Sequence, residues 1–300
     1  MVVRVVGCLS LLLAAGVLAG CAGADAGDRV AAPAASAPPG ADEEQPALDP
    51  LDLIGSWLVT EADEEPGVVL RIAEDIMLWR ACGVQLGQWE AEGGGLFVAG
   101  MDSWTGECSA AQRRTDWLDE STSYRVTAAG VLLTGADGVV RAHLVPGGRP
   151  TPHPNISPEL AEPPEVTDRD RSYRVRPAPA PLPEGVLPAT REQLIGRWVP
   201  AEGSGLDVHG PTYVELGADG RWHGSHGEGL GCPSAGRCVV GSDGRLLSTA
   251  GPVPAVWCPG VDVADWFRDA SRAGFAVAAG DVLVLFDAEG AQTGRLVRAQ

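Results

Sequence analysis

The sequence predicts a mostly β protein of the α+β class, built from two tandem small antiparallel β domains that each carry one covering helix. Three observations predict this fold. The phrase Leu-Ile-Gly-x-Trp occurs at residues 53–57 and again at 194–198. A cysteine pair follows each phrase, with the same spacing inside both pairs. Short runs of β-type residues alternate with Asp-Gly dipeptides at 137, 219 and 243, as is typical of antiparallel hairpins.

The first 20 residues have the layout of an export signal. Arg4 precedes an apolar run at 5–19, which is shorter than the roughly 20 residues that a membrane-spanning helix needs. The run ends in Leu-Ala-Gly-Cys at 18–21, which resembles the lipobox of bacterial lipoproteins. In that family a diacylglyceryl group is attached to the cysteine sulfur, and the chain is cut before it. The resemblance implies a signal peptide at 1–20, a lipid on Cys21, and a mature protein anchored to the outer face of the cell membrane.

Two segments have the composition of linkers. Residues 21–50 are rich in Ala, Pro, Gly and acidic residues, and predict a disordered tether. Residues 148–189 are dense in proline, which extends the backbone and favours a semi-rigid spacer. These segments delimit predicted β domains at 51–147 and 190–300. The run at 168–176 (DRDRSYRVR) alternates enough for an edge strand, but its pattern does not decide its structure.

The similarity between the two halves extends beyond the shared phrase and predicts an internal duplication. Cys82 and Cys108 are 26 residues apart, and so are Cys232 and Cys258. The order of apolar residues around and after the cysteines is also kept. The inferred matches are Leu96-Phe97 with Leu246-Leu247, Trp117-Leu118 with Trp266-Phe267, Tyr124 with Phe275, Val126 with Val277, Leu132-Leu133 with Leu283-Val284, and His143-Leu144-Val145 with Arg295-Leu296-Val297.

Within each copy the sequence predicts strands, one helix and a buried tryptophan. A helix is expected near 112–122 in the first copy and near 262–273 in the second. Trp57 and Trp198 are expected in the core, because large aromatic residues dominate the packing of small domains. The clearest strand signals are TYVEL at 212–216, RWHG at 221–224 and VLVLF at 282–286.

The order of these features resembles the META domain, also called the heat-shock-protein-J-like domain. The resemblance occurs twice, over 51–147 and 190–300. The residues that carry it are Leu53, Gly55, Trp57, Cys82, Thr105 and Cys108 in the first copy, and Leu194, Gly196, Trp198, Cys232 and Cys258 in the second. Gly83 and Pro233 stand where the family usually has Asn, and Ala255 stands in place of its Thr. The resemblance implies a small antiparallel sheet with a helix, and no established catalytic residue.

The cysteines predict disulfide bonds, because an exported chain meets an oxidising environment. We expect Cys82 to be bonded to Cys108, and Cys232 to Cys258. Cys238 is then left unpaired. It could instead compete for Cys232 across a short loop, or lie buried as a small apolar residue.

Three histidines lie near two cysteines in the second copy. His209, His223 and His226, with Cys232 and Cys238, include the residue types that bind zinc. Their spacing matches none of the usual structural zinc patterns. We therefore expect solvated loop histidines, and neither a metal nor another cofactor.

No catalytic constellation is evident in the sequence. Ser225 adjoins His226 without a Gly-x-Ser-x-Gly elbow, and the acidic run at 63–65 (DEE) is expected to be solvated loop charge. A net charge of -18 disfavours nucleic acid as a partner. We therefore expect a non-catalytic cell-surface lipoprotein that serves envelope integrity or stress, or binds an unknown protein or a small apolar ligand. The alternatives are a surface hydrolase or metal-dependent enzyme that uses the segment His209–Cys232, and a protease inhibitor that presents it.

Overall fold

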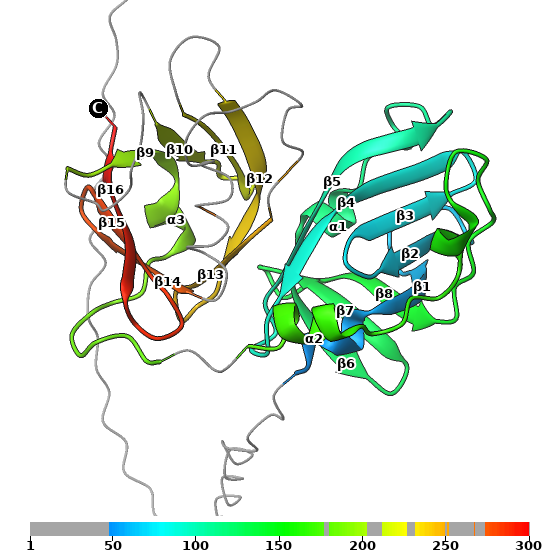
Figure 1. Cartoon of the computed structure of the whole chain (residues 1–300), viewed down its shortest axis with the longest axis horizontal. Helices are drawn as coiled ribbons and strands as arrows, with labels where there is room; N and C mark the ends of the chain where they lie inside the picture. Colours follow the sequence, from blue (N-terminus) through cyan, green and yellow to red (C-terminus); the bar gives the residue numbers. More distant parts are fainter. Residues whose placement is uncertain are drawn as a thin grey trace, which may run out of the picture. The chain divides into compact units, whose positions relative to one another are not determined.

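The computed structural model describes residues 48–176, 180–202, 212–226, 232–249, 251, 267 and 274–299. The predicted signal peptide, the lipidation site Cys21 and most of the tether lie outside these residues. The described chain is mostly β and forms two eight-stranded antiparallel sheets, which confirms the predicted fold class (Figure 1). We call the segments that contain these sheets the first repeat (51–147) and the second repeat (190–300).

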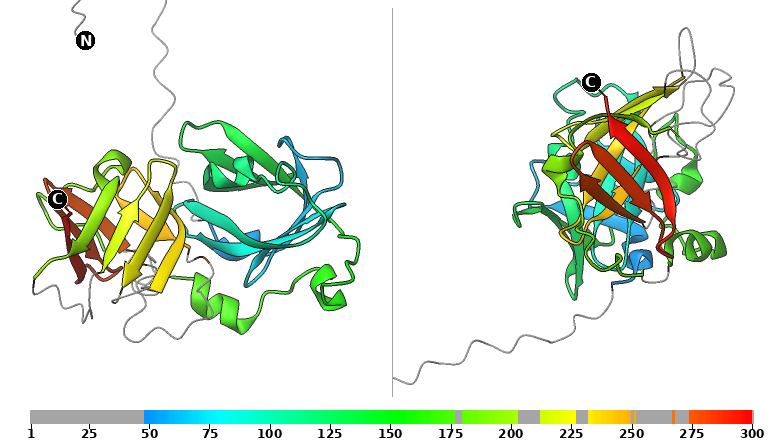
Figure 2. Two further views of the ribbon diagram at one scale, coloured as in Figure 1. Left: turned by 90° about the horizontal axis from the view of Figure 1, so that it is seen from above. Right: turned by 90° about the vertical axis from the view of Figure 1, so that its left-hand side faces the viewer.

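The first repeat is a meander in which each strand pairs with the next except β5 with β6, and β1 also pairs with β8. The two edge strands meet at a bridge between Leu96 and Ser123, and the Tyr124 N–H donates to the Gly95 carbonyl at 2.8 Å. The sheet therefore curls toward a barrel (Figure 2). Its strands are β1 (Gly55–Thr60), β2 (Val69–Ile72), β3 (Ile76–Arg80), β4 (Gly83–Ala91), β5 (Phe97–Gly106), β6 (Ser121–Thr127), β7 (Gly130–Gly135) and β8 (Val140–Pro146).

The second repeat is a closed barrel with the same strand order. Its first strand, β9, takes the place of β1, and the others follow one for one. Equal strand order is what the predicted duplication requires. The strands are β9 (Gly196–Pro200), β10 (Tyr213–Leu216), β11 (Arg221–His226), β12 (Cys232–Val240), β13 (Arg245–Ser248), β14 (Gly274–Ala279), β15 (Val282–Phe286) and β16 (Gln292–Arg298).

The three Asp-Gly dipeptides form hairpin turns, as predicted. In each turn the aspartate carboxylate accepts a hydrogen bond from the N–H two residues further on, at 3.0 or 3.1 Å. Each glycine has a φ between +76° and +83°, which a side chain would disfavour. The turns join β7 to β8 (Asp137-Gly138), β10 to β11 (Asp219-Gly220) and β12 to β13 (Asp243-Gly244).

The repeated phrase Leu-Ile-Gly-x-Trp builds the same contact in both repeats. The indole N–H of Trp57 donates to the Leu53 carbonyl at 2.9 Å, and that of Trp198 donates to the Leu194 carbonyl at 2.7 Å. A Cβ on Gly55 would lie only 3.1 Å from the Trp57 ring, so glycine lets the indole fold back over the backbone. Both tryptophans are buried, which confirms their predicted place in the core.

The structure corrects the alignment of the two repeats by one residue after the helix. Val131 pairs with Leu144, whereas Leu283 pairs with Leu296, the residue that matches Leu144. Val131 therefore corresponds to Leu283. A shift of one residue exchanges the two faces of a strand, and consecutive apolar residues do not reveal it in the sequence. The corrected matches are Leu132-Leu133 with Val284-Leu285, and Tyr124 with Ala276.

The described helices are short, and they are η1 (Pro50–Leu53), α1 (Asp116–Asp119), η2 (Pro158–Ala161), α2 (Asp168–Arg174) and α3 (Arg191–Leu194). The α1 helix lies within the predicted range 112–122 but covers only four residues. The helix predicted at 262–273 lies outside the described residues except for Phe267, which is helical and fully buried.

The run at 168–176 contains the helix α2, although its pattern was also compatible with an edge strand. Thr167 and Asp170 form a capping box, because each side chain accepts a hydrogen bond from the backbone N–H of the other. At the other end, the Arg174 guanidinium lies 3.6 Å from the centre of the Trp89 ring and donates to the Glu74 carbonyl at 2.9 Å. The cap favours the helix, and Arg174 fixes it to the first repeat.

Part of the predicted spacer also packs on the first repeat. Ala161 is buried against an apolar cluster that includes Trp79 and Val84, and Ile156 and Leu160 pack beside it. The proline-rich segment thus joins the repeats and covers part of the outer face of the first sheet.

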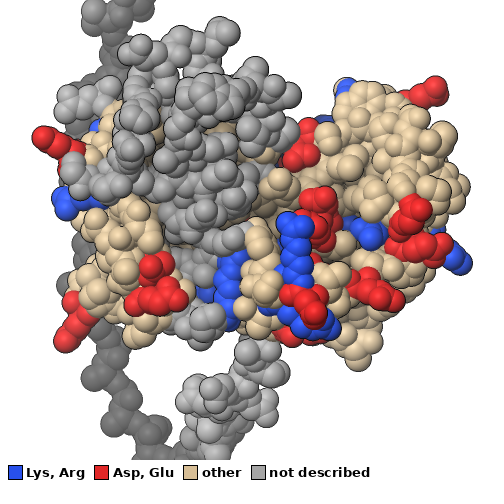
Figure 3. Space-filling view, in the orientation of Figure 1, with Lys and Arg blue, Asp and Glu red and all other residues tan. Residues whose placement is uncertain are grey.

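Residues 46–300 form one compact unit, within which the two repeats contact each other. Leu96 and Val98 of the first repeat share an apolar cluster with Val239 and Leu247 of the second. The carboxylate of Asp119 lies beside the guanidinium groups of Arg221 and Arg237. On the face drawn in Figure 3, arginines are interspersed with acidic residues.

Candidate ligand-binding site

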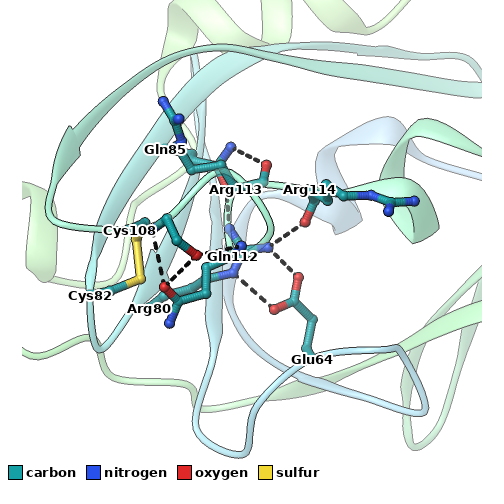
Figure 4. The surroundings of a disulfide bond; sticks show 9 residues. Glu64, Arg80, Cys82, Gln85, Cys108, Gln112, Arg113 and Arg114 are labelled. Atoms are coloured by element: carbon teal, nitrogen blue, oxygen red, sulfur yellow. Dashed lines mark hydrogen bonds and ion pairs between the residues drawn. A yellow bond between two sulfur atoms is a disulfide. The ribbon is translucent and has the colours of Figure 1, made fainter.

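The predicted disulfide of the first repeat is present, and it fixes one end of this repeat. Cys82 and Cys108 are bonded, with their Cα atoms 4.8 Å apart (Figure 4). Cys82 follows β3, and Cys108 is the second residue of the loop at 107–115 that leads from β5 to α1. The Glu107 N–H also donates to the Cys82 carbonyl at 2.8 Å. The start of this loop is therefore held to the turn between β3 and β4.

A buried ion pair holds the other end of the loop. The side chains of Arg80 and Glu64 form an ion pair and are only 5% and 6% exposed. The Arg80 guanidinium donates to the Arg114 carbonyl at 3.0 Å, and the Trp117 indole N–H donates to Glu64 at 2.7 Å. Buried charges need such partners, because removing an ion from water costs roughly several kcal/mol. The expectation that Glu64 is a solvated loop charge is therefore wrong.

Gln85 connects this ion pair to the middle of the loop. Its side-chain oxygen accepts a hydrogen bond from Arg80, and its side-chain N–H donates to the Arg113 carbonyl at 2.8 Å (Figure 4). Gln85 is itself 7% exposed. The disulfide, the ion pair and this amide together hold the backbone of the loop on β3 and β4.

The loop places an arginine over an exposed tryptophan at the end of β5. The Arg113 guanidinium lies 4.3 Å from the centre of the Trp104 ring, a cation–π contact. Trp104 is nevertheless 47% exposed. Beside it is an open depression of about 220 Å³, which we call the Trp104 depression. Its lining residues are Gln85, Met101, Asp102, Ser103, Trp104, Ala110 and Arg113.

Two polar side chains at the Trp104 depression, Arg113 and Asp102, are in unlike states. The Nε–H of Arg113 is buried and has no hydrogen-bond partner among the described residues, although buried donors normally have one. Desolvation raises the pKa of Asp102 and the Asp75 carboxylate adds to this, while hydrogen bonds from its own backbone N–H and from Ser103 lower it. A ligand that donates a hydrogen bond to Asp102 would offset part of this desolvation.

The described cysteine and histidine side chains of the second repeat do not form a reactive group. Cys238 is free and partly buried, and burial raises the pKa of its thiol to about 12, so the nucleophilic thiolate is disfavoured. His223 is exposed, with its Nε2 at 3.4 Å from a carboxylate oxygen of Glu215 and its ring edge-on to Tyr213. Within the described part of the chain, no group of three or more His, Cys, Asp or Glu residues could hold a metal ion.

The remaining predicted site residues fall where the structure gives no side chain. His209 and Cys258 lie outside the described residues, as does Cys21. His226 and Cys232 are described only as backbone, at the ends of β11 and β12. The disulfide between Cys232 and Cys258 therefore stays a prediction.

The sequence analysis did not identify Trp104 and Arg113 as site residues. Trp104 lies in the run Met-Asp-Ser-Trp-Thr-Gly, where polar residues surround one aromatic just before a predicted disulfide cysteine. A polar strand end of this kind is a signal for an exposed tryptophan, but the position of Arg113 depends on Gln85, 28 residues away.

No family model, no curated protein and no solved structure matches this chain. Within the described residues, no helix has both the length and the apolar character needed to cross a membrane.

Proposed function

We propose that this chain is a non-catalytic cell-surface lipoprotein whose two META-like repeats serve ligand binding at the envelope, with the Trp104 depression as the binding surface. The observation that carries the proposal is an exposed indole beside a loop held by a disulfide and a buried ion pair. Large aromatic side chains are enriched at recognition sites. A rigid support favours binding, because less conformational entropy is lost when the ligand arrives.

The surface location is supported by the signal-like segment and by the disulfide. A structural disulfide such as Cys82–Cys108 is typical of an oxidising compartment. Lipidation is tested by labelling cells with a fatty-acid analogue and fractionating them, for the wild type and for Cys21→Ser. We expect label and membrane association in the wild type, and loss of both in Cys21→Ser. A Cys21→Ser variant that stays labelled in the membrane fraction would contradict the lipid anchor.

The binding surface is tested by crosslinking in intact cells. A photoreactive amino acid at Ser103, in the Trp104 depression, should capture envelope material that the same residue at Leu187 does not capture. Leu187 is 78% exposed and lies outside the depression, so it is a matched surface control. The substitution Trp104→Ala should reduce capture from position 103. Equal capture at both positions, or none at either, would contradict a binding surface at Trp104.

The hydrolase alternative makes an opposite prediction about two histidines. Replacing His223 and His226 together by Ala should leave folding and crosslinking unchanged if the protein is a binding protein. Loss of a measurable ester or amide turnover in this variant would instead favour the enzyme. Screening the wild type and this variant side by side, with the same substrates, separates the two functions.

A further inference from the structure

We propose that the Trp104 depression binds a neutral sugar ring by stacking it on the exposed indole. This inference rests on the proposed function, because it names the ligand class of the same site. The Arg113 guanidinium lies over the Trp104 ring at 4.3 Å, yet 47% of the side chain is exposed. An indole covered on one face with about half of its surface free presents its other face to solvent. The π face of an indole is negative, and it attracts the weakly positive C–H groups of a sugar ring.

The polar groups around the indole suit hydroxyl groups. The Asp102 carboxylate is an acceptor, and the Ser103 hydroxyl is both donor and acceptor. The Arg113 Nε–H is buried, and its guanidinium lies over the covered face of the indole, so a ring on the free face does not reach it. Sugar hydroxyls can donate to the Asp102 carboxylate and to the Ser103 oxygen. A purely apolar ligand would use neither acceptor.

The charges at the site disfavour ionic ligands. Asp102 and Arg113 carry opposite charges, so the lining residues sum to about zero. An anionic ligand would also meet the repulsion of a chain with a net charge of -18. A cationic ligand would have to approach an indole that already has a guanidinium at 4.3 Å. The combination favours a neutral ligand with several hydroxyl groups.

The size of the depression favours one ring of a longer chain. Its volume of about 220 Å³ is below the roughly 300 to 1,000 Å³ of enclosed small-molecule pockets. It is open, so neighbouring rings of an oligosaccharide can extend beyond it. Few atoms of the ligand are buried in such a shallow contact, so we expect a dissociation constant roughly in the millimolar range.

The experiment is a titration of the full-length purified chain with neutral trisaccharides. Cellotriose, maltotriose and the N-acetylglucosamine trimer are the probes, and saturation-transfer NMR and calorimetry are the measurements. We expect at least one probe to bind, with affinity at least 10-fold lower in Trp104→Ala, partly kept in Trp104→Phe, and unchanged in Leu187→Ala. A second variant, Arg113→Gln, keeps the backbone carbonyl that Gln85 binds and should also weaken binding, so the test survives if Trp104→Ala misfolds.

Two further arms separate the sugar assignment from the proposed function. A triarginine peptide and a sulfated trisaccharide serve as charged probes at the same concentrations. Absence of sugar binding, or binding that Trp104→Ala leaves unchanged, would overturn the sugar assignment. If envelope crosslinking from position 103 nevertheless captures a protein in a Trp104-dependent way, the proposed function stands and only the sugar assignment falls. If crosslinking also fails, both fall.

Discussion

Removing the Cys82–Cys108 disulfide should destabilise the first repeat by an amount that follows from its loop length. The bond closes a loop with a sequence separation of 26 residues. In the chain-entropy model, closing such a loop stabilises the folded state by about 3.5 kcal/mol at 25 °C. The double variant Cys82→Ser/Cys108→Ser removes the bond without leaving a thiol that could pair wrongly. It should therefore lose about 3 kcal/mol of unfolding free energy in urea.

The assay is equilibrium unfolding in urea, followed by tryptophan fluorescence. For a slope of about 1 to 3 kcal/mol/M, the transition midpoint should fall by roughly 1 to 3 M urea. The variant is a sharper test than a reducing agent, because reduction would also break a disulfide between Cys232 and Cys258. Cys238→Ala is the matched control, since it removes a thiol without removing a bond, and it should cost about 1 kcal/mol or less.

A loss below about 1 kcal/mol in the double variant would refute this reasoning. It would mean that the buried pair of Arg80 and Glu64 already holds the loop in place, so that the disulfide adds little to the free energy of unfolding. In that case Glu64→Gln should be the more destabilising change, because it leaves a buried guanidinium without its counter-charge.

Three further predictions concern single side chains. Trp57→Phe and Trp198→Phe should each cost about 2 to 4 kcal/mol in urea unfolding, since each loses a buried hydrogen bond and core volume, whereas Trp104→Phe should cost less than about 0.5 kcal/mol. Asp102→Asn should raise the unfolding free energy at pH 7 by up to about 0.5 kcal/mol. The folded pKa of Asp102 lies above the unfolded one, so its ionised form disfavours folding, and this gain should disappear as the pH falls through that raised pKa. Cys238 should react with iodoacetamide at pH 8 only after unfolding, because burial raises its pKa to about 12; rapid alkylation of the native chain, read by mass spectrometry, would contradict this.

The parts of the fold that the sequence predicted are those encoded by neighbouring residues. The Asp-Gly turns need only a carboxylate and a glycine in the right order, and the Leu-Ile-Gly-x-Trp contact spans four residues. The disulfide was predictable because the equal cysteine spacing in the two repeats and the expected export of the chain both pointed to it. The helix in the run at 168–176 was not predictable, because strand-like alternation and a capping box coexist there. The capping box of Thr167 and Asp170 favours the helix that the structure shows.

The candidate site was not predictable, because each of its supports joins residues that are distant in the sequence. Glu64 appears as one acidic residue in an acidic run, and only its position beside Arg80, 16 residues away, makes it a buried partner. The contact between Arg113 and Trp104 depends in turn on Gln85 holding the loop backbone. Tertiary placement gives these residues roles that their local sequence does not indicate.

The two repeats differ at a described residue that supports the candidate site in the first one. Strand pairing makes Ser234 the counterpart of Gln85, since three successive pairings lead from the tryptophan of each Leu-Ile-Gly-x-Trp phrase to that residue. Gln85 is long enough to bind both Arg80 and the Arg113 carbonyl, whereas the short, buried hydroxyl of Ser234 has no hydrogen-bond partner within the described chain. A serine there cannot hold a loop in the same way. The two repeats thus share their strand order and the Leu-Ile-Gly-x-Trp contact, and they differ at the position where Gln85 of the first repeat holds the loop beside the proposed binding surface.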